Sequence, residues 1–127
     1  MSRYVVDASA LLAFLNEEPG SEVVEEALPS ALISTVNLSE AIAKLLERGV
    51  PDGEVVAVIG YLDFKVIDFI SVSAWDAARL RPVTRAYGLS FGDRACLGLA
   101  LQQKLPVLTA DSAWRSLSLG VEIHLIR

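Results

Sequence analysis

Four acidic residues lie at or near the start of segments expected to be helical. They are Asp7, Glu40, Asp93 and Asp111. Asp7 and Asp111 each follow a short apolar run of strand character, YVV and VLT. The carboxyl ends of parallel strands meet at one edge of a sheet, and carboxylate oxygens are ligands that Mg²⁺ and Mn²⁺ prefer. The four acids together therefore predict a site for divalent cations.

Each acid also has a purely structural explanation. Asp7 and Asp111 could cap helices, because a side-chain oxygen at that position accepts a backbone N–H that would otherwise be unpaired, and Gly92 with Asp93 could be only a turn that leads into a helix. In NLSE, Asn37 and Glu40 have the spacing of a capping box, and Glu40 precedes Lys44 by four residues, as in a helical ion pair. The four acids together indicate a functional site more strongly than any one of them does. Carboxylates that lie close together repel one another, whereas a divalent cation bound between them attracts them all.

Strand-like and helix-like segments alternate along the chain. Strands are predicted at 3–7, 31–36, 65–70, 106–109 and 121–126, and helices at 9–16, 19–28, 37–49, 52–64, 73–88, 91–102 and 111–117. Pro82 is expected to kink or divide the helix over 73–88. This alternation predicts an α/β fold, a doubly wound three-layer α/β/α sandwich around a central, mainly parallel five-stranded sheet. In such sheets the ligand crevice lies where the strand order reverses, so Asp7 and Asp111 would face it if their strands are neighbours.

Composition limits the classes of protein that fit. With 127 residues, 53% of them hydrophobic, the chain is expected to form a single domain over 1–127. A net charge of -5 argues against nucleic-acid binding through a basic protein surface. If the protein acts on nucleic acid, bound cations would have to supply the positive charge. No apolar run approaches the ~20 residues that a bilayer requires, and MSRYVVDAS lacks the apolar region of a signal peptide. We therefore expect a cytoplasmic protein with no membrane partner, and Cys96, the only cysteine, forms no internal disulfide.

Four stretches carry a family resemblance: VVDASALLAFL, STVNLSE, GLSFGDRACLGLAL and VLTAD. Together they resemble the signature of PIN domains over nearly the whole chain, and the acidic tetrad matches the family's acidic positions in type and order. The chain length and LRPVTRAYGLSFGDRACLGLA most resemble VapC-type toxins of bacterial toxin–antitoxin pairs. The resemblance implies a PIN-like fold and an Mg²⁺- or Mn²⁺-dependent endoribonuclease that acts on RNA. It also implies a cognate small antitoxin as partner and a homodimer.

The resemblance also implies roles for individual residues. Asp7, Glu40, Asp93 and Asp111 would bind metal and carry catalysis, and two ions in such a site stabilise both the attacking and the leaving oxygens. The position of Asp111 varies in the family, so a hydroxyl of Thr109 or Ser112 could share its role. The number of ions, and whether Asp111 is a ligand or only a helix cap, stay open.

Further residues are candidates for contact with substrate or partners. Ser9, Arg94 and Thr109 lie next to the acids in sequence and are candidates for substrate contact, although most surface arginines bind solvent or nearby acids. The apolar residues of 52–64 exceed one helix face and could form a dimer face or a groove for an antitoxin helix. The two tryptophans, Trp75 and Trp114, are expected to pack at edges.

Two alternative functions fit the same size and charge. A receiver-like, Mg²⁺-binding phospho-acceptor domain needs an acidic pair after the first strand and a late Lys, whereas Asp7 stands alone and VEIHLI ends without Lys. A non-catalytic PIN-fold binding module is disfavoured because all four acids are present. The chain has no Gly-rich phosphate loop with Lys, which disfavours nucleotide hydrolysis.

Overall fold

The computed structural model describes residues 1–127 and contains every strand and helix that the sequence predicts. The strands are β1 (Tyr4–Val6), β2 (Ala31–Ser34), β3 (Lys65–Ile67), β4 (Val107–Thr109) and β5 (Ile123–Leu125). The α-helices are α1 (Ala8–Leu15), α2 (Ser21–Ala27), α3 (Thr35–Glu47), α4 (Asp52–Tyr61), α5 (Ser71–Thr84) and α6 (Phe91–Gln103). Three short 3₁₀ helices are η1 (Leu28–Ser30), η2 (Arg85–Tyr87) and η3 (Ser112–Ser116). The predicted alternation is confirmed, with element boundaries displaced by a few residues.

All five strands are parallel, in the order β3-β2-β1-β4-β5. The chain starts at the centre of the sheet, builds one side through β2 and β3, and then crosses to β4 and β5 on the other side. The strand order therefore reverses between β1 and β4, which are neighbours, with Val5 opposite Val107. This order differs from the 2-1-3-4-5 order of flavodoxin-like and receiver domains, so the receiver alternative is wrong.

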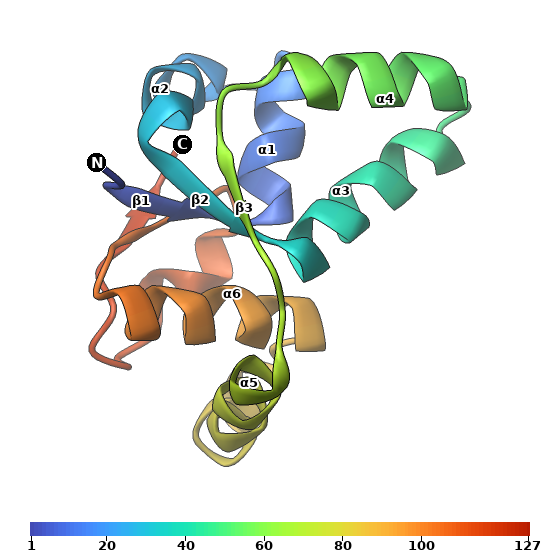
Figure 1. Ribbon diagram of the computed structural model, residues 1–127. Helices are drawn as coiled ribbons and strands as arrows, with labels where there is room; N and C mark the ends of the chain where they lie inside the picture. The colour runs from blue at the N-terminus through green and yellow to red at the C-terminus, as the bar shows by residue number, and fades with distance from the viewer.

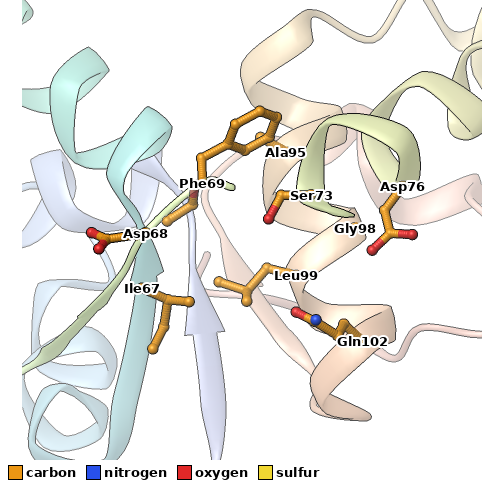
Figure 2. Close-up of a pocket in the computed structure, with 10 residues that line it drawn as sticks. Ile67, Asp68, Phe69, Ser73, Asp76, Ala95, Gly98, Leu99 and Gln102 are labelled. Carbon is orange, nitrogen blue, oxygen red and sulfur yellow. The ribbon is translucent and has the colours of Figure 1, made fainter. Parts of the chain in front are cut away.

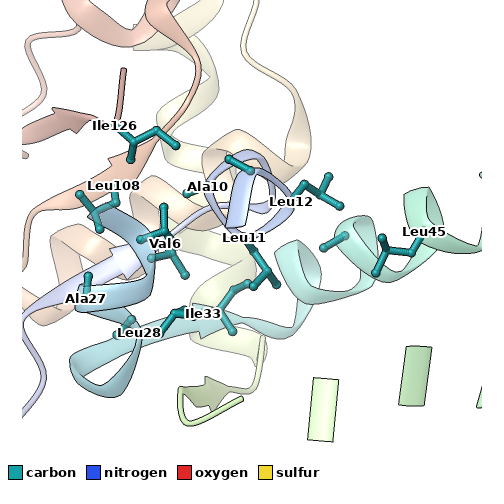
Figure 3. Close-up of a cluster of buried hydrophobic side chains, with 14 of the residues drawn as sticks. Val6, Ala10, Leu11, Leu12, Ala27, Leu28, Ile33, Leu45, Leu108 and Ile126 are labelled. Carbon is teal, nitrogen blue, oxygen red and sulfur yellow. The ribbon is translucent and has the colours of Figure 1, made fainter. Parts of the chain in front are cut away.

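Two hydrophobic cores cover the two faces of the sheet, because successive strand residues point to opposite faces. Val6 and Ile33 belong to the first core, which they share with apolar residues of α1, α2 and α3 (Figure 3). Val5 and Leu32 belong to the second core, with residues of α5 and α6. Figure 1 shows α1, α2 and α4 on one side of the sheet and α5 and α6 on the other. The predicted three-layer α/β/α sandwich is confirmed.

Serine and aspartate side chains set the starts of the helices that surround the carboxyl end of the sheet. Ser34 ends β2 and caps α3, because its Oγ accepts a hydrogen bond of 3.2 Å from the Val36 N–H. The predicted capping box of Asn37 and Glu40 is therefore wrong, and both residues lie inside α3. Glu40 consequently lies in the second turn of this helix.

Pro82 lies inside α5 and does not divide it. The helix continues to Thr84, whose Oγ1 donates a 2.7 Å hydrogen bond to the carbonyl of Leu80. Pro82 has no backbone N–H, so α5 lacks one backbone hydrogen bond there, and only two residues of the helix follow it. With 14 residues α5 is the longest helix, and no helix is both long enough and apolar enough to span a membrane.

Candidate active site

The four predicted acids line one pocket at the carboxyl ends of the strands. The lining residues are Asp7, Ala8, Ser9, Leu12, Asn37, Glu40, Lys44, Asp93 and Asp111. The acids come from four separate segments: the end of β1, the second turn of α3, the start of α6 and the residues after β4. The pocket lies beside the reversal of strand order between β1 and β4, where doubly wound sheets bind their ligands. Folding thus gathers carboxylates that are distant in sequence.

Asp7 is the most buried acid of the pocket, with 5% of its surface exposed. Its Oδ1 accepts hydrogen bonds of 2.8 Å from the Ala10 N–H and from Ser9 Oγ, and its Oδ2 accepts one of 2.6 Å from Thr109 Oγ1. Burial raises the pKa of Asp7 from 3.8 to about 6, although these hydrogen bonds lower it, and the charge of Asp93 adds to the increase. A cation at this carboxylate would favour its charged form.

Thr109 lies beneath the pocket and is fully buried. In addition to its bond to Asp7, its hydroxyl accepts a 3.0 Å hydrogen bond from the Asp111 N–H and lies 3.2 Å from Ser9 Oγ. Ser9 Oγ in turn accepts a 2.9 Å hydrogen bond from the Ala110 N–H. Of the two hydroxyls proposed for substrate contact, only Ser9 lines the pocket, whereas Thr109 orients the acids from below.

Asp93 and Asp111 cap helices and also line the pocket. Asp93 Oδ2 accepts from the Ser90 N–H at 2.9 Å while Ser90 Oγ accepts from the Asp93 N–H at 3.2 Å, which forms a capping box. Asp111 Oδ1 accepts a 3.0 Å hydrogen bond from the Ala113 N–H at the start of η3. In each case the second carboxylate oxygen makes no hydrogen bond within the protein, so the structural role leaves one oxygen free for a ligand.

Glu40 makes a different contact from the one that its sequence position suggests. Its Oε1 accepts a 2.9 Å hydrogen bond from Asn37 Nδ2, and it forms no ion pair with Lys44, which is the only cation that lines the pocket. Asn37 also donates to the carbonyl of Gly92, at 2.9 Å. Sequence reasoning missed Asn37 as a site residue, although a spacing of three residues in a helix does place two side chains on one face.

Arg94 lies outside the acidic pocket. Its Nη1 donates a 3.0 Å hydrogen bond to the carbonyl of Ala77 in α5, and its guanidinium lies 5.9 Å from the ring centroid of Phe91. Successive residues of an α-helix are rotated by about 100°, so the residue after Asp93 faces α5 when Asp93 faces the pocket. Arg94 therefore joins two helices, and we leave it out of the proposed site.

The donor set fits a hydrated divalent cation better than a closed cage of four carboxylates. No three Asp, Glu, His or Cys side chains are close enough to coordinate one ion as they stand. Mg²⁺ commonly takes one or two carboxylates and keeps several of its waters, and the second oxygens of Asp93 and Asp111 are free to bind such an ion or one of its waters. The ion pairs of the protein, His124–Glu122 and Arg127–Glu18, involve none of these acids.

A second hollow lies on the side of the sheet covered by α5 and α6. Its lining residues are Ser34, Ile67, Asp68, Phe69, Ser73, Asp76, Ala95, Gly98, Leu99 and Gln102. Figure 2 shows the carboxylate of Asp68 turned away from α5 and α6, where Asp76 and Gln102 lie. Because its two carboxylates do not face each other, this hollow offers no cation site, and we assign function to the acidic pocket.

The chain is similar to known proteins in sequence and in fold. The family model of the PIN domain matches residues 4–118. Ribonuclease VapC30 of Mycobacterium tuberculosis is 32% identical over 115 residues, which cover 82% of this chain and 86% of the relative. The structure of DNA-bound VapBC from Salmonella typhimurium is similar in fold, with a TM-score of 0.77, 19% identity and 100% of both chains covered.

A further solved structure has the same fold. VapC20 of Mycobacterium tuberculosis, a toxin that cleaves the sarcin–ricin loop, has a TM-score of 0.70 and 12% identity, with 94% of this chain and 98% of that chain covered. At such identities the solved structures show the fold alone, whereas the family model spans most of the chain, including all four acids of the pocket. The chain therefore belongs to the PIN domain family.

Proposed function

We propose that residues 1–127 form a single PIN domain that acts as a metal-dependent endoribonuclease. The observation that carries this proposal is the pocket in which acids from four segments meet around a single lysine. Such a concentration of negative charge is unfavourable unless the site binds cations. Bound cations would also attract the phosphate groups of a nucleic acid, which the acidic protein otherwise repels. The similarity to Ribonuclease VapC30 supports RNA as the substrate.

We propose a part in hydrolysis of the phosphodiester bond for each of these side chains. Bound Mg²⁺ or Mn²⁺ would supply positive charge and lower the pKa of an attacking water. Asp7 and Asp93 would hold the ion, and Glu40 and Asp111 would hold a second ion or orient the water. Ser9 and Thr109 fix the carboxylate of Asp7 through hydrogen bonds.

Lys44 is the one group in the lining that carries positive charge of its own. It is exposed and makes no ion pair, so its ammonium is free to contact a phosphate of the RNA. This contact would contribute to binding, because Lys acts on phosphate as a point charge.

The decisive experiment is a Mn²⁺-dependent cleavage assay over total cellular RNA, with the ends of the products mapped. We expect cleavage by the parent protein, loss of cleavage in EDTA, and no cleavage by Asp93→Asn. Activity that survives EDTA or this substitution contradicts the assignment. If the purified parent cleaves nothing with Mn²⁺, the non-catalytic binding module is the better description.

We further propose that the chain is the toxin of a VapBC-type pair, with a small antitoxin as partner, and that it forms a homodimer. VapBC complexes among the solved structures of the same fold support a partner of this kind. Helix α4 also leaves Val56, Val58 and Tyr61 exposed, and exposed apolar patches commonly mark protein interfaces. Growth arrest on expression, relieved by a co-expressed neighbouring small protein, tests the toxin assignment, and sedimentation equilibrium tests the dimer.

A further inference from the structure

We infer that Asn37 is a positioning residue, which holds the carboxylate of Glu40 against the start of α6. The inference rests on the proposed function, because Asn37 and Glu40 line the proposed active site. Asn37 is 1% exposed and lies one turn before Glu40 in α3. Its Nδ2 donates one 2.9 Å hydrogen bond to Glu40 Oε1 and another to the carbonyl of Gly92. A single amide group thus joins the acid of α3 to the residue that precedes Asp93.

The surroundings of Asn37 determine which end of its amide faces the pocket. Both neighbours, a carboxylate oxygen and a backbone carbonyl, are acceptors, so only the NH₂ group can face them. Asn37 Oδ1 is buried and has no hydrogen-bond partner. A buried unpaired oxygen costs stability, which a smaller or apolar residue would avoid. We therefore attribute the presence of Asn37 at this position to the two hydrogen bonds that its NH₂ group donates.

Gly92 lies directly against the carboxylate of Glu40. A Cβ at Gly92 would overlap the carboxylate of Glu40. Gly92 lies in the first turn of α6, where the backbone conformation does not demand glycine. The missing side chain thus provides the space that the carboxylate occupies.

These contacts place the carboxylate of Glu40 beside the residue that precedes Asp93. Glu40 contacts both the amide of Asn37 and the backbone of Gly92. Two like charges separate unless other contacts hold them, so the distance between these acids depends on this arrangement. Asn37 is 1% exposed, so we expect it to act through the groups that it bonds, Glu40 and the Gly92 carbonyl, rather than by contact with RNA.

The test measures Mn²⁺ affinity by calorimetry without RNA, and kcat and KM for RNA, in the parent, Asn37→Ala and Gly92→Ala. The matched control is Ser39→Ala, an exposed neighbour on the same helix. We expect Asn37→Ala and Gly92→Ala each to lower Mn²⁺ affinity and kcat by about 10- to 100-fold, as substitutions behind metal ligands do, with KM for RNA nearly unchanged. Gly92→Ala keeps the amide of Asn37 and displaces Glu40 by steric overlap, so it tests the arrangement independently.

A double-mutant cycle separates positioning from a general loss of stability. In a Glu40→Gln background, Asn37→Ala should lower Mn²⁺ affinity by less than about twofold, because residues that act through one contact are not additive. In the metal-free parent, the side-chain NH₂ protons of Asn37 should be protected from solvent exchange, and urea denaturation checks that each variant is folded. Equal losses in both backgrounds, or parental Mn²⁺ affinity in Asn37→Ala, overturn the inference. A parent that neither binds Mn²⁺ nor cleaves RNA instead overturns the proposed function.

Discussion

Asp111 shows how one side chain serves both the fold and the site. Its Oδ1 caps η3 while the residue lines the pocket, so the structural and the functional explanation of this acid are compatible. The same holds for Asp93 in its capping box with Ser90. The sequence could predict these positions because caps and strand ends have recognisable residue types. It could not decide between the two explanations, since the decision depends on which segments fold together.

The substitution Asp111→Asn separates the charge of this residue from its cap. Asn accepts the Ala113 N–H as Asp does, so the free energy of unfolding should change by less than about 0.5 kcal/mol. Loss of the charge should lower Mn²⁺-dependent cleavage by at least about tenfold, measured under single-turnover conditions. Asp111→Ala serves as the comparison that loses both properties. Full activity in Asp111→Asn would show that this acid is only a cap.

Asp7→Asn should change how stability depends on pH. The pKa of Asp7 is raised to about 6 by burial, so its contribution to stability is fully present below about pH 4 and is lost as the pH rises through about 6. In metal-free protein at neutral pH, Asp7→Asn should therefore be more stable than the parent by up to about 3 kcal/mol. This advantage should vanish at about pH 4. Urea denaturation across this range checks it, and a difference that does not vary with pH contradicts the assigned cause.

At the level of elements, alternating strands and helices gave the correct architecture, but side-chain contacts across elements were beyond prediction. The start of α3 was misplaced because two capping signals, at Ser34 and at Asn37, follow each other closely, and Ser34 lies directly at the end of β2. Trp114 was expected at an edge but is fully buried in the second core, whereas Trp75 is exposed. Burial of a single aromatic depends on the three-dimensional neighbours of η3, which local periodicity does not report.

The capping box of α6 gives a prediction for one element. Ser90→Ala removes the hydroxyl that accepts the Asp93 N–H, and it should lower the free energy of unfolding by about 1 kcal/mol. The carboxylate of Asp93 keeps its bond to the backbone N–H of residue 90, so cleavage should fall by less than about tenfold at temperatures where the protein is folded. Urea denaturation measures the first effect. Ser118→Ala, an exposed serine without a cap, is the control and should leave stability unchanged.

At the scale of the whole molecule, the pocket links four segments of the chain, so a bound ion should stabilise the entire fold. Mn²⁺ at about 100 times its dissociation constant should raise the free energy of unfolding by about 2.7 kcal/mol, because the ion binds only the folded protein. Thermal denaturation with and without Mn²⁺ measures the effect. Asp93→Asn should show a smaller shift, and equal shifts in both proteins would place the ion elsewhere.

Under the proposed function, the overall charge of the molecule makes a bound ion important for substrate binding as well. The chain carries 16 acidic and 11 Lys or Arg residues, so its mean field repels a polyanion. Composition alone predicted this requirement for local positive charge. Composition could not reveal that Lys44 is the only cation in the pocket lining. The spacing of four residues instead predicted an ion pair of Lys44 with Glu40, in which the charge of Lys44 would be neutralised.

The central position of β1 has a consequence for synthesis on the ribosome. β1 is the first strand of this sequence, yet its neighbour β4 is completed only at Thr109. Until that point has left the exit tunnel, Asp7 has no Thr109 hydroxyl beside it and Asp111 has no place to dock. A nascent chain therefore completes the acidic pocket only after β4 and the residues that follow it have been synthesised.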